Sequence, residues 1–257
     1  MPLFNTPAVI IRSMDFSESD KLVTFFTQKC GKIKGIAKGA KRSKKRFSGT
    51  LELFSLVNLQ FFEKSTSDLT RIDHCDLIKA FSEIRRDIKK VGYASYFMEL
   101  IDEIVGEKEK NSELFEPLVT LLSVLNGNKK FSEGIVRIFE IRFLSILGYQ
   151  PNLNSCTLCR NVFQNEAQVW FSPSQGGAIC HKCSPGLTDV YSVSRGTLKI
   201  LNRGREISLD KIDRLAFSQQ ALSESKEILS KFIRFHLNKD LKSLRFMDKM
   251  KKSVFKR

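Results

Sequence analysis

The residues best suited to chemistry are four cysteines in the second half of the chain. They form two pairs, Cys156 with Cys159 and Cys180 with Cys183, and two residues separate the members of each pair. A two-residue spacer lets both sulfurs of a pair point toward one centre, and the twenty residues between the pairs are typical of structural zinc sites. The sequence therefore predicts one structural Zn2+ ion with a shell of four thiolates and no coordination position open for a reaction.

The segment between the two cysteine pairs must bring them together. Residues 169–171 and 176–179 can form a hairpin that does so, inside an insertion at residues 152–186 that holds few helix-forming residues. Two other interpretations of the cysteines stay open. They can be two unrelated pairs of reduced thiols, or they can form an iron–sulfur cluster or a redox pair.

A second group of residues is defined by its charge. Eight of the fifteen residues from 32 to 46 are Lys or Arg and none is acidic, in a chain whose formal net charge is +15. Such a basic track, in which Gly35 and Gly39 permit close backbone approach, is typical of proteins that bind a nucleic-acid phosphate backbone. The eight cations are Lys32, Lys34, Lys38, Lys41, Arg42, Lys44, Lys45 and Arg46.

The positions of the first three cations add a structural expectation. Lys32, Lys34 and Lys38 have the same parity, so an intact strand would place them on one face. A solvated loop and a localisation signal are the alternative interpretations of the whole basic stretch.

Two neighbouring features have both a functional and a structural interpretation. Phe47 adjoins the basic residues, where it can stack on a base or belong to the core. Asp15, Glu18 and Asp20 can indicate a metal site, but we favour a polar turn because no second acidic cluster completes a two-metal site. The chain also lacks a G-x-x-x-x-G-K-[ST] loop and a G-x-S-x-G motif, so the sequence offers no positive case for an enzyme.

Length and composition restrict the class of protein. The 257 residues are 42% hydrophobic and 28% charged, which is ordinary for a globular protein of one or two domains. No apolar run reaches the roughly 18 residues of a membrane span, and residues 1–16 lack the basic start and cleavage site of a secretory signal. Six cysteines are too few for a disulfide scaffold. We therefore expect a cytoplasmic protein.

The hydrophobic pattern changes at about residue 80. Short alternating runs before it predict the five strands of a small barrel or sandwich, and helical periodicity dominates after it. The expected strands are residues 7–14, 21–28, 32–38, 51–62 and 68–78, and the clearest expected helices are residues 82–105, 112–125, 132–147 and 218–238. We therefore expect an α+β protein, with a strand domain at residues 1–80 and a helical domain at residues 81–257 that carries the cysteine insertion.

Several short segments within residues 8–60 occur together in a combination that is specific to one family. They are Val9–Arg12, Glu18–Val23, Phe26–Thr27, Gly31–Ile33, Ala37–Arg42, Phe47, Gly49 and Leu51. With the helical middle and the four-cysteine insertion, they make the chain resemble the RecO family of bacterial DNA repair and recombination mediators. Not all members of that family keep four cysteines, so the zinc prediction rests on the residues themselves.

The resemblance implies a five-stranded OB-fold barrel at residues 1–80 that binds nucleic acid, and a helical domain with the zinc module. It also implies binding of single- and double-stranded DNA, annealing of complementary strands without ATP, and loading of RecA, together with RecR, onto DNA coated by the single-stranded-DNA-binding protein SSB. RecF is a further partner that it suggests. Carried over by position, the DNA-facing residues are Arg12, Lys32, Lys34, Lys38, Lys41 and Arg42. Lys44, Lys45 and Arg46 are added from charge alone.

Two function classes compete with this interpretation. A zinc-containing RNA-binding or translation-associated factor would have the same charge and cysteines, and a preference for structured RNA would identify it. A nucleic-acid-processing enzyme would depend on magnesium and on Asp15, Glu18 or Asp20 for strand cleavage.

Overall fold

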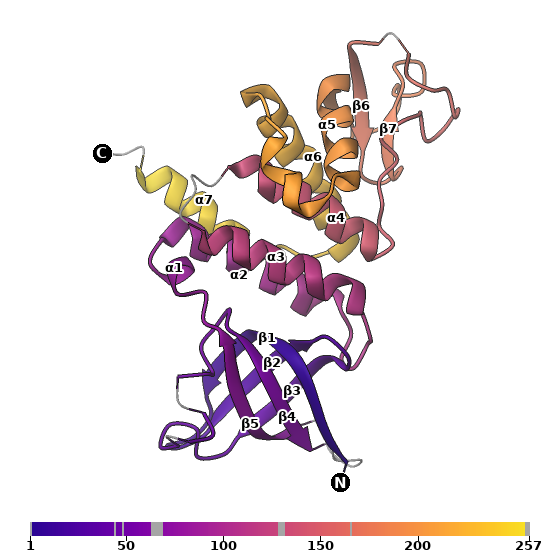
Figure 1. The fold of residues 1–257 in the computed structure, drawn as a ribbon. Coiled ribbons are helices and arrows are strands. Elements are labelled where there is room, and N and C mark those ends of the chain that lie inside the picture. The colour runs from indigo at the N-terminus through magenta and orange to yellow at the C-terminus, as the bar shows by residue number, and fades with distance from the viewer. Residues whose placement is uncertain are drawn as a thin grey trace. The chain divides into compact units, whose positions relative to one another are not determined.

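The structure, a computed structural model, describes residues 2–43, 45–47, 49–62, 69–127, 132–164 and 166–254. The chain divides into two compact units, of which the first joins Met1–Asn128 to Leu241–Arg257 and the second is Lys129–Asp240 (Figure 1). The change from strands to helices falls near residue 80, as the hydrophobic pattern predicts. The first compact unit extends beyond that point because its helices pack on one another and on the barrel. The domain boundary at residue 80 stays a prediction.

The described part of the first unit begins with a five-stranded barrel. Its strands are β1 (Leu3–Asp15), β2 (Lys21–Thr27), β3 (Gly31–Ala37), β4 (Leu56–Phe62) and β5 (Thr70–Lys79). The barrel closes in the order β1-β2-β3-β5-β4, with β3 and β5 parallel and the other neighbours antiparallel. This five-stranded closed arrangement is the OB-like barrel that was expected, and the α+β fold class is confirmed.

The fourth strand shows why alternation alone misplaces a strand end. Val57, Leu59 and Phe61 are buried in the barrel, as their common parity predicts. The strand begins at Leu56, so the expected start at residue 51 is wrong. Leu51 and Phe54 are also buried, but they reach the core from a turn in which Phe54 adopts φ 73°. The apolar pattern therefore extends over buried residues that precede the strand, and it does not mark where the strand begins.

The helices of the first unit follow the barrel. They are α1 (Ser82–Arg85), α2 (Ile88–Ile104), the 3₁₀ helix η1 (Ser112–Leu114), α3 (Phe115–Asn126) and the C-terminal α7 (Lys242–Val254). The single helix expected at residues 82–105 is wrong, because extended backbone at Asp87 interrupts it and the Asp87 carboxylate caps α2 by accepting from the N–H groups of Lys89 and Lys90. The Glu99 carboxylate of α2 likewise accepts from the N–H groups of Lys242 and Ser243, both at 2.8 Å, and so caps α7.

The second unit combines helices with a small sheet. Its elements are α4 (Glu133–Ile146), β6 (Gln168–Ser172), β7 (Gly177–Ile179), β8 (Tyr191–Ser194), α5 (Arg195–Glu206), the 3₁₀ helix η2 (Leu209–Arg214) and α6 (Gln219–Leu237). The strands pair in the order β7-β6-β8. Ser132 and Ser218 cap α4 and α6 with their side chains, so both predicted helices are confirmed to within a residue or two. Among the described residues, no helix is long and apolar enough to span a membrane.

Candidate metal centre and nucleic-acid interface

The four cysteine sulfurs of the second unit lie within 4.8 Å of one another. The sulfurs of Cys159 and Cys180 are 3.7 Å apart. A tetrahedral site with metal–sulfur bonds of about 2.3 Å has sulfur–sulfur edges of about 3.8 Å. The residues therefore fit a tetrahedral metal ion, and in the described part of the chain this is the group of metal-ligating side chains that the fold gathers in one place.

Each cysteine pair is held by a tight turn. At the first turn, the Arg160 N–H donates to the carbonyl of Cys156 at 2.9 Å, and Arg160 adopts φ 63°. At the second turn, the N–H groups of Cys183 and Ser184 both donate to the carbonyl of Cys180 at 3.1 Å. The two-residue spacer thus forms the same kind of backbone turn twice, which aims both sulfurs of a pair at one point.

The predicted hairpin brings the two turns together. Strands β6 and β7 pair with Trp170 opposite Ile179, one residue before Cys180. The Thr157 N–H of the first turn donates to the carbonyl of Ala178 in β7 at 2.9 Å. Close packing continues at Gly177, where a Cβ atom would lie 2.3 Å from the carbonyl oxygen of Asn152. The hairpin is therefore the element that converts two local motifs into one site.

The thiols of this cluster differ strongly in acidity. Burial opposes ionisation of Cys156, but the N–H groups of Cys159 and Cys180 donate to its sulfur and lower the pKa of this thiol to about 6. Hydrogen bonds with the sulfurs of Cys180 and Cys159 raise the pKa of Cys183 to about 12. One thiolate thus forms readily, whereas several adjacent thiolates need a cation to offset their repulsion.

The basic residues of the first unit are arranged less uniformly than their sequence suggests. Lys34 in β3 is exposed, and so are Lys38, Lys41, Arg42 and Lys45 in the segment that follows this strand. We call residues 38–46 the basic loop. Lys44 lies outside the described residues.

Lys32 is buried, unlike Lys34 on the same strand. The strand edge at Lys32 is covered by backbone contacts. The Lys108 N–H donates to the Lys32 carbonyl, and Glu107 forms an isolated parallel β-bridge with Lys32. The Lys32 side chain is 10% exposed, and its Nζ lies 3.2 Å from Oδ1 of Asp102 in α2. Lys32 and Lys34 thus lie on the same face of β3, as their parity predicts, but Lys32 is covered, and Lys38 lies beyond the end of the strand at Ala37.

Asp102 also contacts the first predicted DNA-facing residue. Nη1 of Arg12 lies 3.2 Å from Oδ2 of Asp102, and the Arg12 side chain stays 59% exposed. One carboxylate thus pairs with a buried lysine and with a surface arginine. Asp102 could not be predicted from the sequence, because an acidic residue within a helix carries no signal for partners 70 and 90 positions earlier in the chain.

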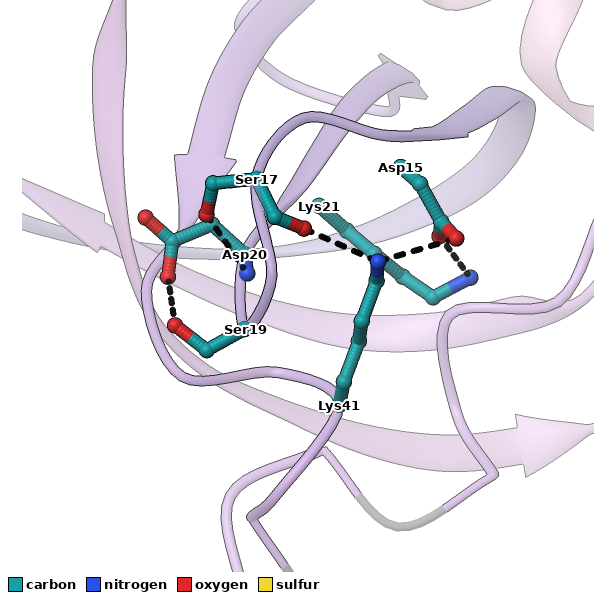
Figure 2. A network of polar contacts seen from close by, with 6 residues as sticks. All are labelled: Asp15, Ser17, Ser19, Asp20, Lys21 and Lys41. Carbon is teal, nitrogen blue, oxygen red and sulfur yellow. Dashed lines mark hydrogen bonds and ion pairs between the residues drawn. The ribbon is translucent and has the colours of Figure 1, made fainter.

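Lys41 and Arg46 have partners inside the protein. Lys41 Nζ lies 2.9 Å from Oδ2 of Asp15 and donates to the Ser17 carbonyl at 2.9 Å (Figure 2). Arg46 Nη2 donates to the Lys38 carbonyl at 2.8 Å, and its guanidinium lies 5.0 Å from the ring centroid of Phe47. These contacts close the basic loop on itself and on the turn before β2.

The barrel also shows where Phe47 and the acidic residues before β2 lie. Phe47 is 3% exposed and belongs to the barrel core, so the base-stacking interpretation is wrong. The acidic residues 15–20 form a polar turn between β1 and β2, as favoured from the sequence. Asp20 accepts a hydrogen bond from the Gly39 N–H, which lowers the pKa of its carboxyl, and a hydrogen bond from Lys41 lowers that of Asp15.

Comparison with known proteins gives one consistent result. The family model described as "Recombination protein O N terminal" matches residues 1–81, and "Recombination protein O C terminal" matches residues 85–245. The "DNA repair protein RecO" of Syntrophus aciditrophicus (strain SB) is 38% identical over 249 residues, which cover 96% of each chain. The proteins of that name from Desulfatibacillum aliphaticivorans and Anaeromyxobacter sp. (strain K) are each 34% identical, over 99% and 94% of this chain and 100% and 94% of theirs.

Proposed function

Because the chain belongs to the RecO family of DNA repair and recombination proteins, we propose that it binds single- and double-stranded DNA and anneals complementary strands. Annealing without ATP requires only that a protein screen two polyanions from each other while the bases search for register. No bond of the DNA is made or broken in such a reaction, and we propose that the protein is a mediator and not an enzyme.

The observation that carries this proposal is the exposure of four cations around the basic loop. Lys34, Lys38, Arg42 and Lys45 can contact phosphates of one strand without reading its sequence. Four such contacts predict that log K falls with log salt at a slope of about −3, at roughly −0.7 per contact for single strands. Arg12 extends this surface in the proposal, and Lys44 stays a prediction.

The remaining predicted residues receive a different role. Lys32, Lys41 and Arg46 have internal partners, so we propose that they position the surface and do not bind phosphate. If every cation of residues 32–46 bound phosphate instead, the salt slope would approach about −6 by the same arithmetic.

The family relationship supports specific partners. We propose that the protein acts with RecR to load RecA onto single-stranded DNA coated by SSB, with RecF as a further partner. The first unit would supply the DNA contact, and the helical part would supply contacts with proteins.

We propose that Cys156, Cys159, Cys180 and Cys183 hold one structural Zn2+ ion. The sulfur–sulfur spacing and the complete set of four thiols support this assignment. When bound, the ion would offset the charge of the thiolates and link the two turns through one centre. The chain's own contribution is the pair of turns and the hairpin that present the sulfurs.

The proposal is tested by fluorescence annealing of complementary oligonucleotides, naked and coated with SSB, without ATP. We expect annealing of both substrates, and a marked loss on the double change Lys38→Glu and Arg42→Glu. The matched control changes Lys89→Glu and Lys110→Glu, which are exposed, carry the same charges and lie outside the basic loop.

Several results would contradict the proposed DNA annealing by the basic loop. Binding of DNA without annealing, or a clear preference for structured RNA, would favour the RNA-binding alternative. Magnesium-dependent strand cleavage that depends on Asp15, Glu18 or Asp20 would establish an enzyme. An equal effect of the control variant would show that the total charge, and not the basic loop, determines binding.

A further inference from the structure

The acidic turn, residues 15–20, carries three acidic residues beside the most basic segment of the chain. By charge alone, Asp15, Glu18 and Asp20 should weaken the binding of a polyanion to this surface. The turn overlaps the Glu18–Val23 segment, one of those on which the family resemblance rests, and the proposed function gives these acidic residues no role. Their contacts show what they do in the fold.

Asp20 forms the most specific contacts of the acidic turn. Its carboxylate accepts from the Gly39 N–H at 2.9 Å and from the Ser19 hydroxyl at 2.9 Å. Its own N–H donates to the Ser17 hydroxyl at 3.1 Å, which orders the turn itself (Figure 2). Gly39 adopts φ 69°, so the carboxylate holds the chain where the basic loop leaves β3 in a left-handed conformation.

A second connection joins the two segments two residues further along. The Lys41 N–H donates to the Ser19 carbonyl at 2.9 Å. The Lys41 ammonium pairs with Asp15 at 2.9 Å, and Lys21 lies 3.6 Å from the same carboxylate. The Lys41 ammonium therefore has partners inside the protein before any phosphate approaches.

Glu18 is the contrasting member of the turn. Its side chain is 95% exposed, and Oε2 lies 4.0 Å from Nη2 of Arg42, at the outer limit of an ion pair. A pair with this exposure restricts neither side chain appreciably. Glu18 thus provides a natural control with the same charge and a neighbouring position.

From these contacts we propose that Asp20 and Asp15 are positioning residues of the nucleic-acid interface, which hold the basic loop in its binding conformation through Gly39 and Lys41. Ordering the loop before binding removes an entropic cost from the binding step, so the two acids raise affinity although they lower the local positive charge. This inference rests on the proposed DNA-binding function. It also assigns Lys41 to the structure of the loop and not to phosphate contact.

A positioning role and simple electrostatics predict opposite changes in DNA affinity for one variant. Asp20→Ala removes a negative charge and should tighten DNA binding if only charge matters. If Asp20 positions the loop, the same change should weaken binding by about tenfold, because the Gly39 N–H loses a charged acceptor. Asp20→Asn keeps a carbonyl oxygen that accepts this hydrogen bond and should retain most of the affinity.

The experiment measures binding of the full chain to a fluorescent oligothymidylate by anisotropy, at four salt concentrations, for wild type, Asp20→Ala, Asp20→Asn and Glu18→Gln. We expect weaker binding for Asp20→Ala alone. Binding of Asp20→Ala that equals or exceeds that of wild type overturns the inference. Failure of the wild type to bind DNA would instead overturn the proposed function.

A second pair of variants keeps the inference testable if Asp20→Ala does not fold. Lys41→Gln should lower affinity without changing the salt slope, whereas Lys38→Gln should make the slope shallower by about 0.7. An equal change of slope for both variants would show that Lys41 contacts phosphate and would overturn its assignment to the loop structure.

Discussion

The four-cysteine cluster and the basic loop reach their geometry by different routes. In the four-cysteine cluster, each pair of cysteines lies within four residues of chain, and a repeated backbone turn aims both sulfurs at one centre. In the basic stretch, the seven described cations have three kinds of environment, which are exposure, burial against a helix, and pairing with a neighbouring turn. Spacing therefore predicts a ligand set well, because covalent geometry limits where the sulfurs can go. Charge predicts a surface poorly, because the partner of each cation is chosen by the fold.

The strongest test of this comparison removes the metal ligands. Cys156→Ser combined with Cys159→Ser should lower the melting temperature by on the order of 10 °C, because binding of a structural metal contributes directly to folding stability. DNA affinity per folded molecule should change little, since the basic loop belongs to the other compact unit. Differential scanning fluorimetry with and without a chelator measures the first effect. Cys30→Ser is the control, and equal melting temperatures for wild type with and without chelator would contradict the prediction.

The next test concerns the buried cation of the basic stretch. Asp102→Ala leaves the largely buried Lys32 ammonium without its carboxylate and should destabilise the first unit by about 3 kcal/mol. Chemical denaturation followed by circular dichroism measures this change. Lys32→Met should restore part of the loss in the double variant, because the unpaired charge is then removed. If Asp102→Ala left stability unchanged, Lys32 would behave like its exposed neighbours.

A smaller effect is expected at the aromatic residue beside the loop. Phe47→Leu should destabilise the protein by about 1 kcal/mol, because the change leaves a partly filled site in the barrel core. The salt slope of DNA binding should stay the same, since the ring does not reach the surface. Thermal unfolding and anisotropy on the same sample separate the two effects. A loss of DNA affinity with unchanged stability would restore the stacking interpretation.

The smallest expected effect is a dependence of the loop on acidic pH. Hydrogen bonds from Gly39 and Lys41 hold the carboxyl pKa values of Asp20 and Asp15 below their ordinary values. Their stabilising contribution is therefore complete above the unfolded value, near 3.9, and is lost as pH falls through the lower folded values. The Gly39 amide resonance should accordingly stay constant from pH 7 to about 4 and shift only below that. A shift between pH 7 and 5 would require another titrating group.

Much of the framework could be predicted from residue pattern. The strands at residues 21–27 and 31–37, the caps at Ser132 and Ser218, and the hairpin between the cysteine pairs follow from alternation, capping chemistry and turn residues. The predicted bounds of strands and helices are wrong where the burial of side chains and the secondary structure of the backbone do not coincide. Leu51 and Phe54 are buried from a turn, and Ile88 is 57% exposed although it fits a helical stripe. A local apolar pattern therefore does not fix the backbone conformation of a residue, and it does not predict burial at every position.

Residue types and spacing predict the four-cysteine cluster, the class of the barrel and the presence of a basic segment, since each shows as a local pattern in the chain. Tertiary structure alone decided which cations are accessible. Asp102 reaches Lys32 and Arg12 across the packing of α2 on the barrel, and Asp15 and Asp20 reach Lys41 and Gly39 across neighbouring strand ends. A Coulomb interaction depends on distance in space, which the order of residues does not contain.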